Sequence, residues 1–199
     1  MIKTTQYKND SILKDILHLY CNDAPTFECD LTFSVGNFYQ TKKEFFLPYP
    51  PFKYDKFPAN EDVHPLDKAE EELEDDSLNS VIADPPFLIG TSKSMTKMAQ
   101  RFTKFQTEDE CKEANKNLLT IAYHKLKKGG ILAYKIQDTK ISADYQSWEH
   151  IWLYNMAEEL GFKMVDMFVL VSNNNGTPLT GTQRSAKKNH SYIMVFKKK

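Results

Sequence analysis

The chain has 199 residues and a formal net charge of −1 at pH 7, and its 41% hydrophobic and 27% charged residues are typical of one globular domain with a sizeable core. No window is long and apolar enough to cross a bilayer, and the first residues lack the apolar stretch of a secretory signal, so we expect a cytoplasmic protein. The spacing of Cys21, Cys29 and Cys111 argues against a zinc site or a disulfide framework.

Charge is divided unevenly along the chain. Residues 1–86 contain 8 Lys and Arg against 17 Asp and Glu, a net charge of −9, whereas residues 87–199 contain 18 against 10, a net charge of +8. The basic second part predicts a surface that faces a polyanion, although a run of charge is more often a solvated surface.

The first part of the chain predicts a helix and then a ligand loop. Apolar side chains recur at helical spacing over residues 11–20, within an N-terminal helical segment of residues 1–25. A short strand then ends at Asp30 and leads into a loop of small residues around Ser34 and Gly36, which would let a ligand approach the backbone closely. One glycine falls short of the Gly-x-Gly-x-x-Gly fingerprint, so an ordinary turn explains the loop equally well.

The next three strand candidates also end in acidic side chains. The first ends in Asp55, 25 residues after Asp30, close to the spacing at which doubly wound nucleotide-binding folds place an acid on the ribose hydroxyls. A short strand-like segment ends at Asp67, and an apolar strand over residues 78–83 leads into Asp84. Strands that repeatedly end in an acid predict a parallel α/β sheet with a ligand at the carboxyl ends of the strands.

The last of these strands is followed by Asp84, Pro85, Pro86 and Phe87. Two successive prolines donate no backbone hydrogen bonds, so the strand must stop there. In the resulting stiff turn, the carboxylate and a proline carbonyl could accept hydrogen bonds from an amino group, and the phenylalanine could stack on a flat ligand. A simple strand end with a core phenylalanine explains the tetrapeptide equally well.

Helices and strands alternate in the rest of the chain. We expect a basic, hydroxyl-rich segment at residues 88–106, helices at 108–126 and 145–160, strands at 131–136, 162–171 and 191–196, and a long polar connection at 172–189. Because no helix separates the last two strands, they should pair antiparallel. We see no internal boundary and expect a single domain over residues 1–199.

These motifs, in this order, resemble the class I S-adenosylmethionine-dependent methyltransferases, and within them the amino-methyltransferases that modify adenine N6 or cytosine N4. Residues 84–87 match the catalytic Asp/Asn-Pro-Pro-aromatic motif of that group, residues 127–132 look like its turn into the fifth strand, and residues 190–196 look like its final strand. The resemblance implies a Rossmann-like, doubly wound, mostly parallel sheet of about seven strands with the last strand antiparallel.

The resemblance also implies S-adenosylmethionine as the cofactor and roles for individual residues. The cofactor loop would consist of Asp30, Thr32, Ser34 and Gly36, with Asp55 on the ribose and Asp67 on the adenine amine of the cofactor, and the catalytic residues would be Asp84, Pro85, Pro86 and Phe87. The loop keeps one glycine where the family usually has two. A non-catalytic nucleic-acid-binding scaffold that has lost cofactor binding is therefore the alternative.

The same resemblance implies that the two basic segments bind nucleic acid. The expected nucleic-acid contacts are Lys93, Lys97, Arg101 and Lys104 in the first segment and Arg184, Lys187 and Lys188 in the second. They would flank the pocket and bind phosphates, with solvated loops as the alternative. We expect adenine-N6 methylation of DNA by a compact enzyme of phage or mobile-element type, and methylation of an RNA base (adenine N6 or guanine N2) stays open. Without an insertion large enough for a target-recognition domain, we expect a short recognition site, low specificity, an RNA substrate, or a homodimer or partner subunit that contributes to target recognition.

Overall fold

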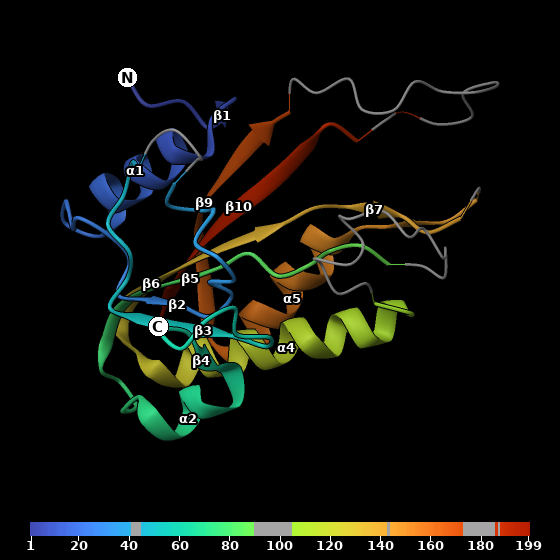
Figure 1. Ribbon diagram of the computed structural model, residues 1–199. Helices are drawn as coiled ribbons and strands as arrows, with labels where there is room; N and C mark the ends of the chain where they lie inside the picture. The colour runs from blue at the N-terminus through green and yellow to red at the C-terminus, as the bar shows by residue number, and fades with distance from the viewer. Residues whose placement is uncertain (41–44, 90–104, 143, 173–185, 187) are drawn as a thin grey trace.

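A computed structural model describes residues 1–40, 45–89, 105–142, 144–172, 186 and 188–199. Its centre is an eight-stranded sheet in the order β1-β9-β10-β6-β5-β2-β3-β4 (Figure 1). The strands are β1 (Thr5–Gln6), β2 (Cys29–Asp30), β3 (Phe52–Asp55), β4 (His64–Pro65), β5 (Leu78–Ala83), β6 (Leu126–Ile136), β9 (Phe162–Val171) and β10 (His190–Lys198). Neighbouring strands are parallel except at β10, which pairs antiparallel with both β6 and β9.

This topology confirms the predicted Rossmann-like fold and the antiparallel pairing of the last two strands. The sheet has one strand more than the seven expected, because β1 pairs in parallel with β9 at Val169 and Leu170. A strand of two residues is too short to show a period-two pattern, so the sequence gives no signal for it.

Helices cover both faces of the sheet, as Figure 1 shows. They are α1 (Asn9–Tyr20), α2 (Ala69–Glu72), preceded by the 3-10 helix η1 (Leu66–Lys68), α4 (Glu108–Lys125) and α5 (Glu149–Leu160). Ile12 and Ile16 of α1 pack with Ile193 of β10 on one face, whereas Leu119 of α4 and Leu153 of α5 pack on the other. Within the described residues, no helix is long and apolar enough to cross a membrane.

Two element boundaries differ from the prediction. The helix expected at residues 145–160 begins only at Glu149, because Gln146–Ser147 forms strand β8 and pairs antiparallel with β7 (Thr139–Lys140). The Ser147 hydroxyl donates to Glu108 at 3.2 Å, a tertiary contact that joins β8 to α4. The strand expected at residues 131–136 begins earlier, at Leu126. The two glycines after α4 lie in an irregularity of this strand, where Leu78 pairs with Leu126 but Ser80 pairs with Ile131.

Candidate active site

The four acids predicted at strand ends surround one cavity of about 600 Å³. Asp30, Asp55, Asp67 and Asp84 all line it, together with Pro85 and Pro86. They come together because β2, β3, β4 and β5 run parallel and end at the same edge of the sheet. The arrangement predicted from the sequence is therefore present, and it gives the cavity several oxygen acceptors for the hydroxyl and amino groups of a ligand.

Asp30 organises the loop that follows β2. It is 3% exposed. One carboxylate oxygen accepts a hydrogen bond from the Thr32 backbone at 2.8 Å and the other accepts one from the Tyr39 hydroxyl at 2.8 Å. Burial raises the pKa of Asp30 to about 7, against the opposing effect of these hydrogen bonds. Its main structural task is thus to hold the loop in place.

Thr32 joins this loop to the Asp-Pro-Pro-Phe motif. Its hydroxyl accepts a hydrogen bond from the Asp84 backbone N–H at 2.7 Å and donates to Asp30 at 3.2 Å. Strand β2 lies beside β5, with Asp30 opposite Ile82, so the first residues beyond the two strands meet. The two predicted parts of the site are consequently built as one unit.

Asp55 holds the middle of the loop. Its two carboxylate oxygens accept the backbone N–H groups of Ser34 and Phe57, each at 2.8 Å, and burial raises its pKa. Ser34 has a φ of +51°, a strained value for a residue other than glycine that this hydrogen bond helps to stabilise. Ser34 therefore presents its side chain at the cavity lining beside Asp55.

Gly36 and Asp67 occupy the periphery of the predicted cofactor site. Gly36 has a φ of +74° and lies outside the cavity lining, where an added Cβ would come within 2.9 Å of the rings of Phe33 and Tyr49. Gly36 thus allows the loop to pack closely against these two rings without itself lining the cavity. The strand expected to end at Asp67 ends at Pro65 instead, and Asp67 lies on η1, where it is exposed and lines the cavity next to Leu66.

The predicted catalytic motif lies partly in the cavity lining, at Asp84, Pro85 and Pro86, and partly outside it, at Phe87. Asp84 is half-buried and its carboxylate lies 2.9 Å from the Lys135 ammonium. Phe87 does not line the cavity, and its backbone carbonyl accepts a hydrogen bond from the Thr139 hydroxyl at 2.8 Å. The sequence analysis missed both Lys135 and Thr139, although a lysine within an otherwise apolar strand was a signal that could have identified the first.

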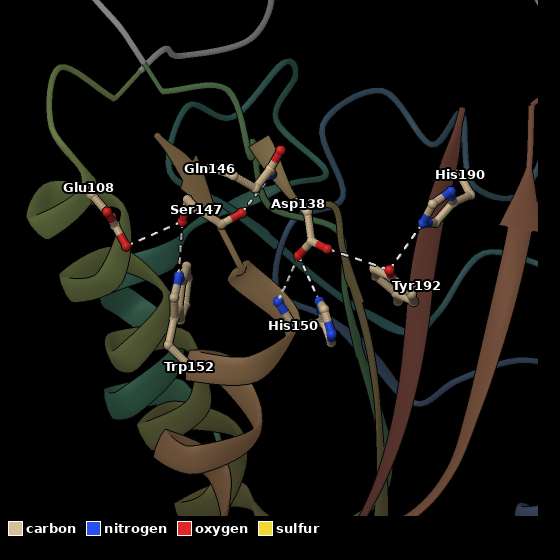
Figure 2. A network of polar contacts seen from close by, with 8 residues as sticks. All are labelled: Glu108, Asp138, Gln146, Ser147, His150, Trp152, His190 and Tyr192. Atoms are coloured by element: carbon tan, nitrogen blue, oxygen red, sulfur yellow. Dashed lines mark hydrogen bonds and ion pairs between the residues drawn. The ribbon is translucent and has the colours of Figure 1, made fainter. Parts of the chain in front are cut away.

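A polar network lies at the end of β6, next to Thr139 (Figure 2). The buried Asp138 carboxylate lies 2.7 Å from His150 Nδ1 of α5 and accepts a longer hydrogen bond of 3.4 Å from the Tyr192 hydroxyl of β10. Figure 2 also shows Ser147 between Glu108 of α4 and Trp152 of α5. The contacts of Asp138, which were not predicted from the sequence, fix the end of β6 against α5 and β10.

Glu149, at the start of α5, is fully buried, and neither carboxyl oxygen has a well-aligned hydrogen-bond partner among the described residues. Burial raises its pKa to about 8, an effect that the nearby Thr139 hydroxyl opposes. The folded protein therefore retains this proton up to a pH of about 8, whereas the unfolded chain releases it near the ordinary value of 4.5. Stability should fall as the pH rises between these two values.

We expect Glu149→Gln to unfold at about the same denaturant concentration as the wild type at pH 5, and to be more stable by about 2–4 kcal/mol at pH 9. The amide resembles the neutral acid but cannot ionise. Denaturant unfolding measured from pH 5 to 9 tests this, with Glu159→Gln, at an exposed site on the same helix, as the control. Parallel pH profiles for the wild type and Glu149→Gln would contradict the assignment.

Most of the predicted phosphate contacts lie outside the described residues. These are Lys93, Lys97, Arg101, Lys104, Arg184 and Lys187. Lys188 is described, and its ammonium lies 5.0 Å from the centroid of the Trp148 ring, which is 49% exposed. A lysine ammonium above an exposed aromatic ring occurs at nucleic-acid-binding surfaces and also at other protein surfaces.

A sequence model of the family described as DNA methylase, with N6 and N4 specificities, matches residues 78–199, which is more than half of the chain. The chain belongs to the N6/N4 DNA methylase family. The match begins at β5 and includes the Asp-Pro-Pro-Phe motif, Lys135 and the network around Asp138. Members of this family use S-adenosylmethionine as the methyl donor. The sequence matches none of the curated proteins with which it was compared.

Solved methyltransferases share the fold at low sequence identity. The 1,6-didemethyltoxoflavin-N1-methyltransferase of Burkholderia thailandensis is 12% identical with a TM-score of 0.52, over 97% of this chain and 79% of that one. A chain from a Haloferax volcanii complex between the Trm112 methyltransferase activator and a methyltransferase is 14% identical with a TM-score of 0.51, over 94% and 92%.

A Thermus thermophilus protein described as a DNA modification methylase is 18% identical with a TM-score of 0.45, over 65% of this chain. This chain covers 50% of the Thermus protein and so spans about half of its length.

Proposed function

We propose that this protein transfers a methyl group from S-adenosylmethionine to an exocyclic amine of a nucleic-acid base, and that the base is adenine in DNA, methylated at N6. The observation that supports this proposal is the hydrogen bond between Thr32 and the Asp84 backbone, which joins the Asp-Pro-Pro-Phe motif to the loop that lines the acidic cavity. We further propose that residues 1–199 act as a single domain.

The lining of the cavity suits the cofactor chemically. S-adenosylmethionine supplies a methyl group already activated by a positively charged sulfur, and the acidic side chains of the cavity can accept hydrogen bonds from the hydroxyl and amino groups of the cofactor. Asp55 would bind the ribose hydroxyls, because each of its oxygens accepts one backbone N–H and keeps a second lone pair. Asp67 would accept from the adenine amine, and the loop of Asp30, Thr32 and Ser34 would enclose the rest.

The protein's contribution to the reaction is to prepare the amine. The lone pair of an aromatic exocyclic amine is delocalised into the ring, so the nitrogen is a poor nucleophile. Hydrogen bonds from its two N–H groups to the Asp84 carboxylate and the Pro85 carbonyl would localise that pair and aim it at the methyl group. Phe87, which lies outside the cofactor cavity, would stack on the target base from the other side after the base has left the duplex.

The target strand would bind at the same edge of the sheet. Lys188 and the other predicted basic residues would contact phosphates, as the net charge of +8 on residues 87–199 favours. Cytosine N4 and RNA bases present the same chemical group to the motif. A partner subunit or a second copy would contribute to recognition of the target sequence.

Nucleoside analysis tests the proposal directly. The protein is incubated with isotopically labelled S-adenosylmethionine and with DNA or RNA, and the digested nucleosides are identified by mass spectrometry. We expect N6-methyldeoxyadenosine. Label in cytosine N4 or in RNA would reassign the substrate, and no detectable cofactor binding by calorimetry at millimolar concentration would favour the non-catalytic scaffold.

A further inference from the structure

Lys135 occupies an unusual place for a lysine, inside a central strand of the sheet. Tyr134, the preceding residue of β6, pairs with Ala83 of β5, so Lys135 stands one step further on, beside Asp84. Tyr134 packs on the α4 face, where its hydroxyl donates to Asn115 at 2.7 Å. Because side chains alternate along a strand, Lys135 extends from the opposite face, toward the cofactor loop.

Two contacts hold the Lys135 ammonium. It lies 2.9 Å from Asp84 Oδ2 and 5.0 Å from the centroid of the Phe38 ring, and Phe38 lines the cofactor cavity. The side chains of Lys135 and Asp84 are 17% and 26% exposed. A pair with this little exposure is poorly screened by water and is held in one geometry.

Asp84 is therefore fixed from two directions. Thr32 holds its backbone N–H at 2.7 Å and Lys135 holds one carboxylate oxygen. The buried Asp30 carboxyl, whose pKa the Asp84 charge helps to raise, would otherwise repel the Asp84 carboxylate. The Lys135 ammonium opposes this repulsion and keeps the acid at the cavity edge.

We propose that Lys135 is a positioning residue for methyl transfer: by binding Asp84 Oδ2 it orients the carboxylate so that Oδ1 faces the amine of the target base. This inference rests on the proposed function and adds a residue to it. A salt bridge that only joined β5 to β6 would stabilise the protein without affecting the turnover of a bound substrate. A positioning role predicts that substitution of Lys135 lowers kcat, whereas a purely structural role predicts that it lowers only the free energy of unfolding.

The test compares Lys135→Met, Lys135→Arg and Lys53→Met. Lys53 is the matched control, because its ammonium lies 5.7 Å from the Phe33 ring in the same loop region, outside the cavity lining. We expect Lys135→Met to lower kcat by about 10- to 100-fold, the range that a carboxylate displaced by an ångström produces. Its dissociation constant for S-adenosylmethionine should change by less than about threefold. Arginine should recover at least about tenfold of the lost kcat, since it keeps the charge and the hydrogen bond.

A double-mutant cycle supplies the decisive readout. In an Asp84→Asn background Lys135→Met should have little further effect on the residual kcat, because the carboxylate that it orients is gone. A Lys135→Met protein with wild-type kcat, or one whose loss is equal in both backgrounds, would overturn the inference. A wild-type protein that binds the cofactor but methylates no nucleic acid would instead overturn the proposed function.

Discussion

We expect Asp84→Ala to lower methyl transfer strongly and to leave cofactor binding nearly intact. The expected fall in kcat is at least about 10²- to 10³-fold, the usual result of losing a group that contacts the reacting atoms in the transition state. The substitution would delete the proposed acceptor of one amine N–H, while the backbone N–H of residue 84 would still bond to Thr32. Single-turnover transfer of a labelled methyl group measures the loss, and calorimetry with S-adenosylmethionine checks the cofactor site.

Two variants calibrate this result. Asp84→Asn keeps one acceptor oxygen and the shape of the side chain, so it should retain more activity than the alanine variant. Asp144→Ala removes an exposed acid outside the cavity and should leave turnover unchanged. An Asp84→Ala protein that turns over as fast as the Asp144→Ala control would place the chemistry elsewhere in the chain.

The second large effect is expected at Gly36. Alanine there must adopt a φ of +74°, and its Cβ would lie 2.9 Å from atoms of the Phe33 and Tyr49 rings. We expect a loss of about 2–4 kcal/mol in the free energy of unfolding, from backbone strain and overpacking together. Cofactor affinity should fall as well, because Phe33 lines the cavity and stacks at 5.7 Å on Tyr39, the residue that donates to Asp30.

Gly129→Ala separates the effect of backbone strain from that of overpacking. Gly129 has a φ of +81°, but its added Cβ would meet only Lys197 Cε, at 3.6 Å. This control should lose about 1–2 kcal/mol from backbone strain alone and keep its cofactor affinity. Denaturant unfolding and calorimetry on both variants decide the matter, and equal losses at the two glycines would show that the packing behind the cofactor loop is unimportant.

The fold could be predicted where the sequence has a long, regular pattern. Strands β5, β9 and β10 and helix α4 each show a period that stands out from their surroundings, and each was predicted within a few residues. Strands β1 and β8 were not, because two residues carry no period and their pairing depends on distant partners. Local pattern fails where tertiary contacts decide the structure.

The candidate site likewise contains residues that could be predicted from the sequence and residues that could not. Its acids could be predicted because each follows a strand, and parallel strands bring their ends together. Their partners could not: Lys135 lies 51 residues from Asp84, Thr139 lies 52 residues from Phe87, and only the register of β5 against β6 brings them near. Gly36 could be singled out from the sequence, but its place behind the loop follows from aromatic rings whose packing no motif encodes.

The double hydrogen bond of Thr32 also determines where the chain can grow. The short segment between Asp30 and Thr32 must place one hydroxyl against both the Asp30 carboxylate and the Asp84 backbone N–H. An insertion of even one residue there would move the hydroxyl by more than the length of a hydrogen bond. The Ser34 backbone N–H bonds to Asp55 at 2.8 Å and extends the restriction to Ser34, so a lengthened loop is compatible with these contacts only if the added residues follow Ser34.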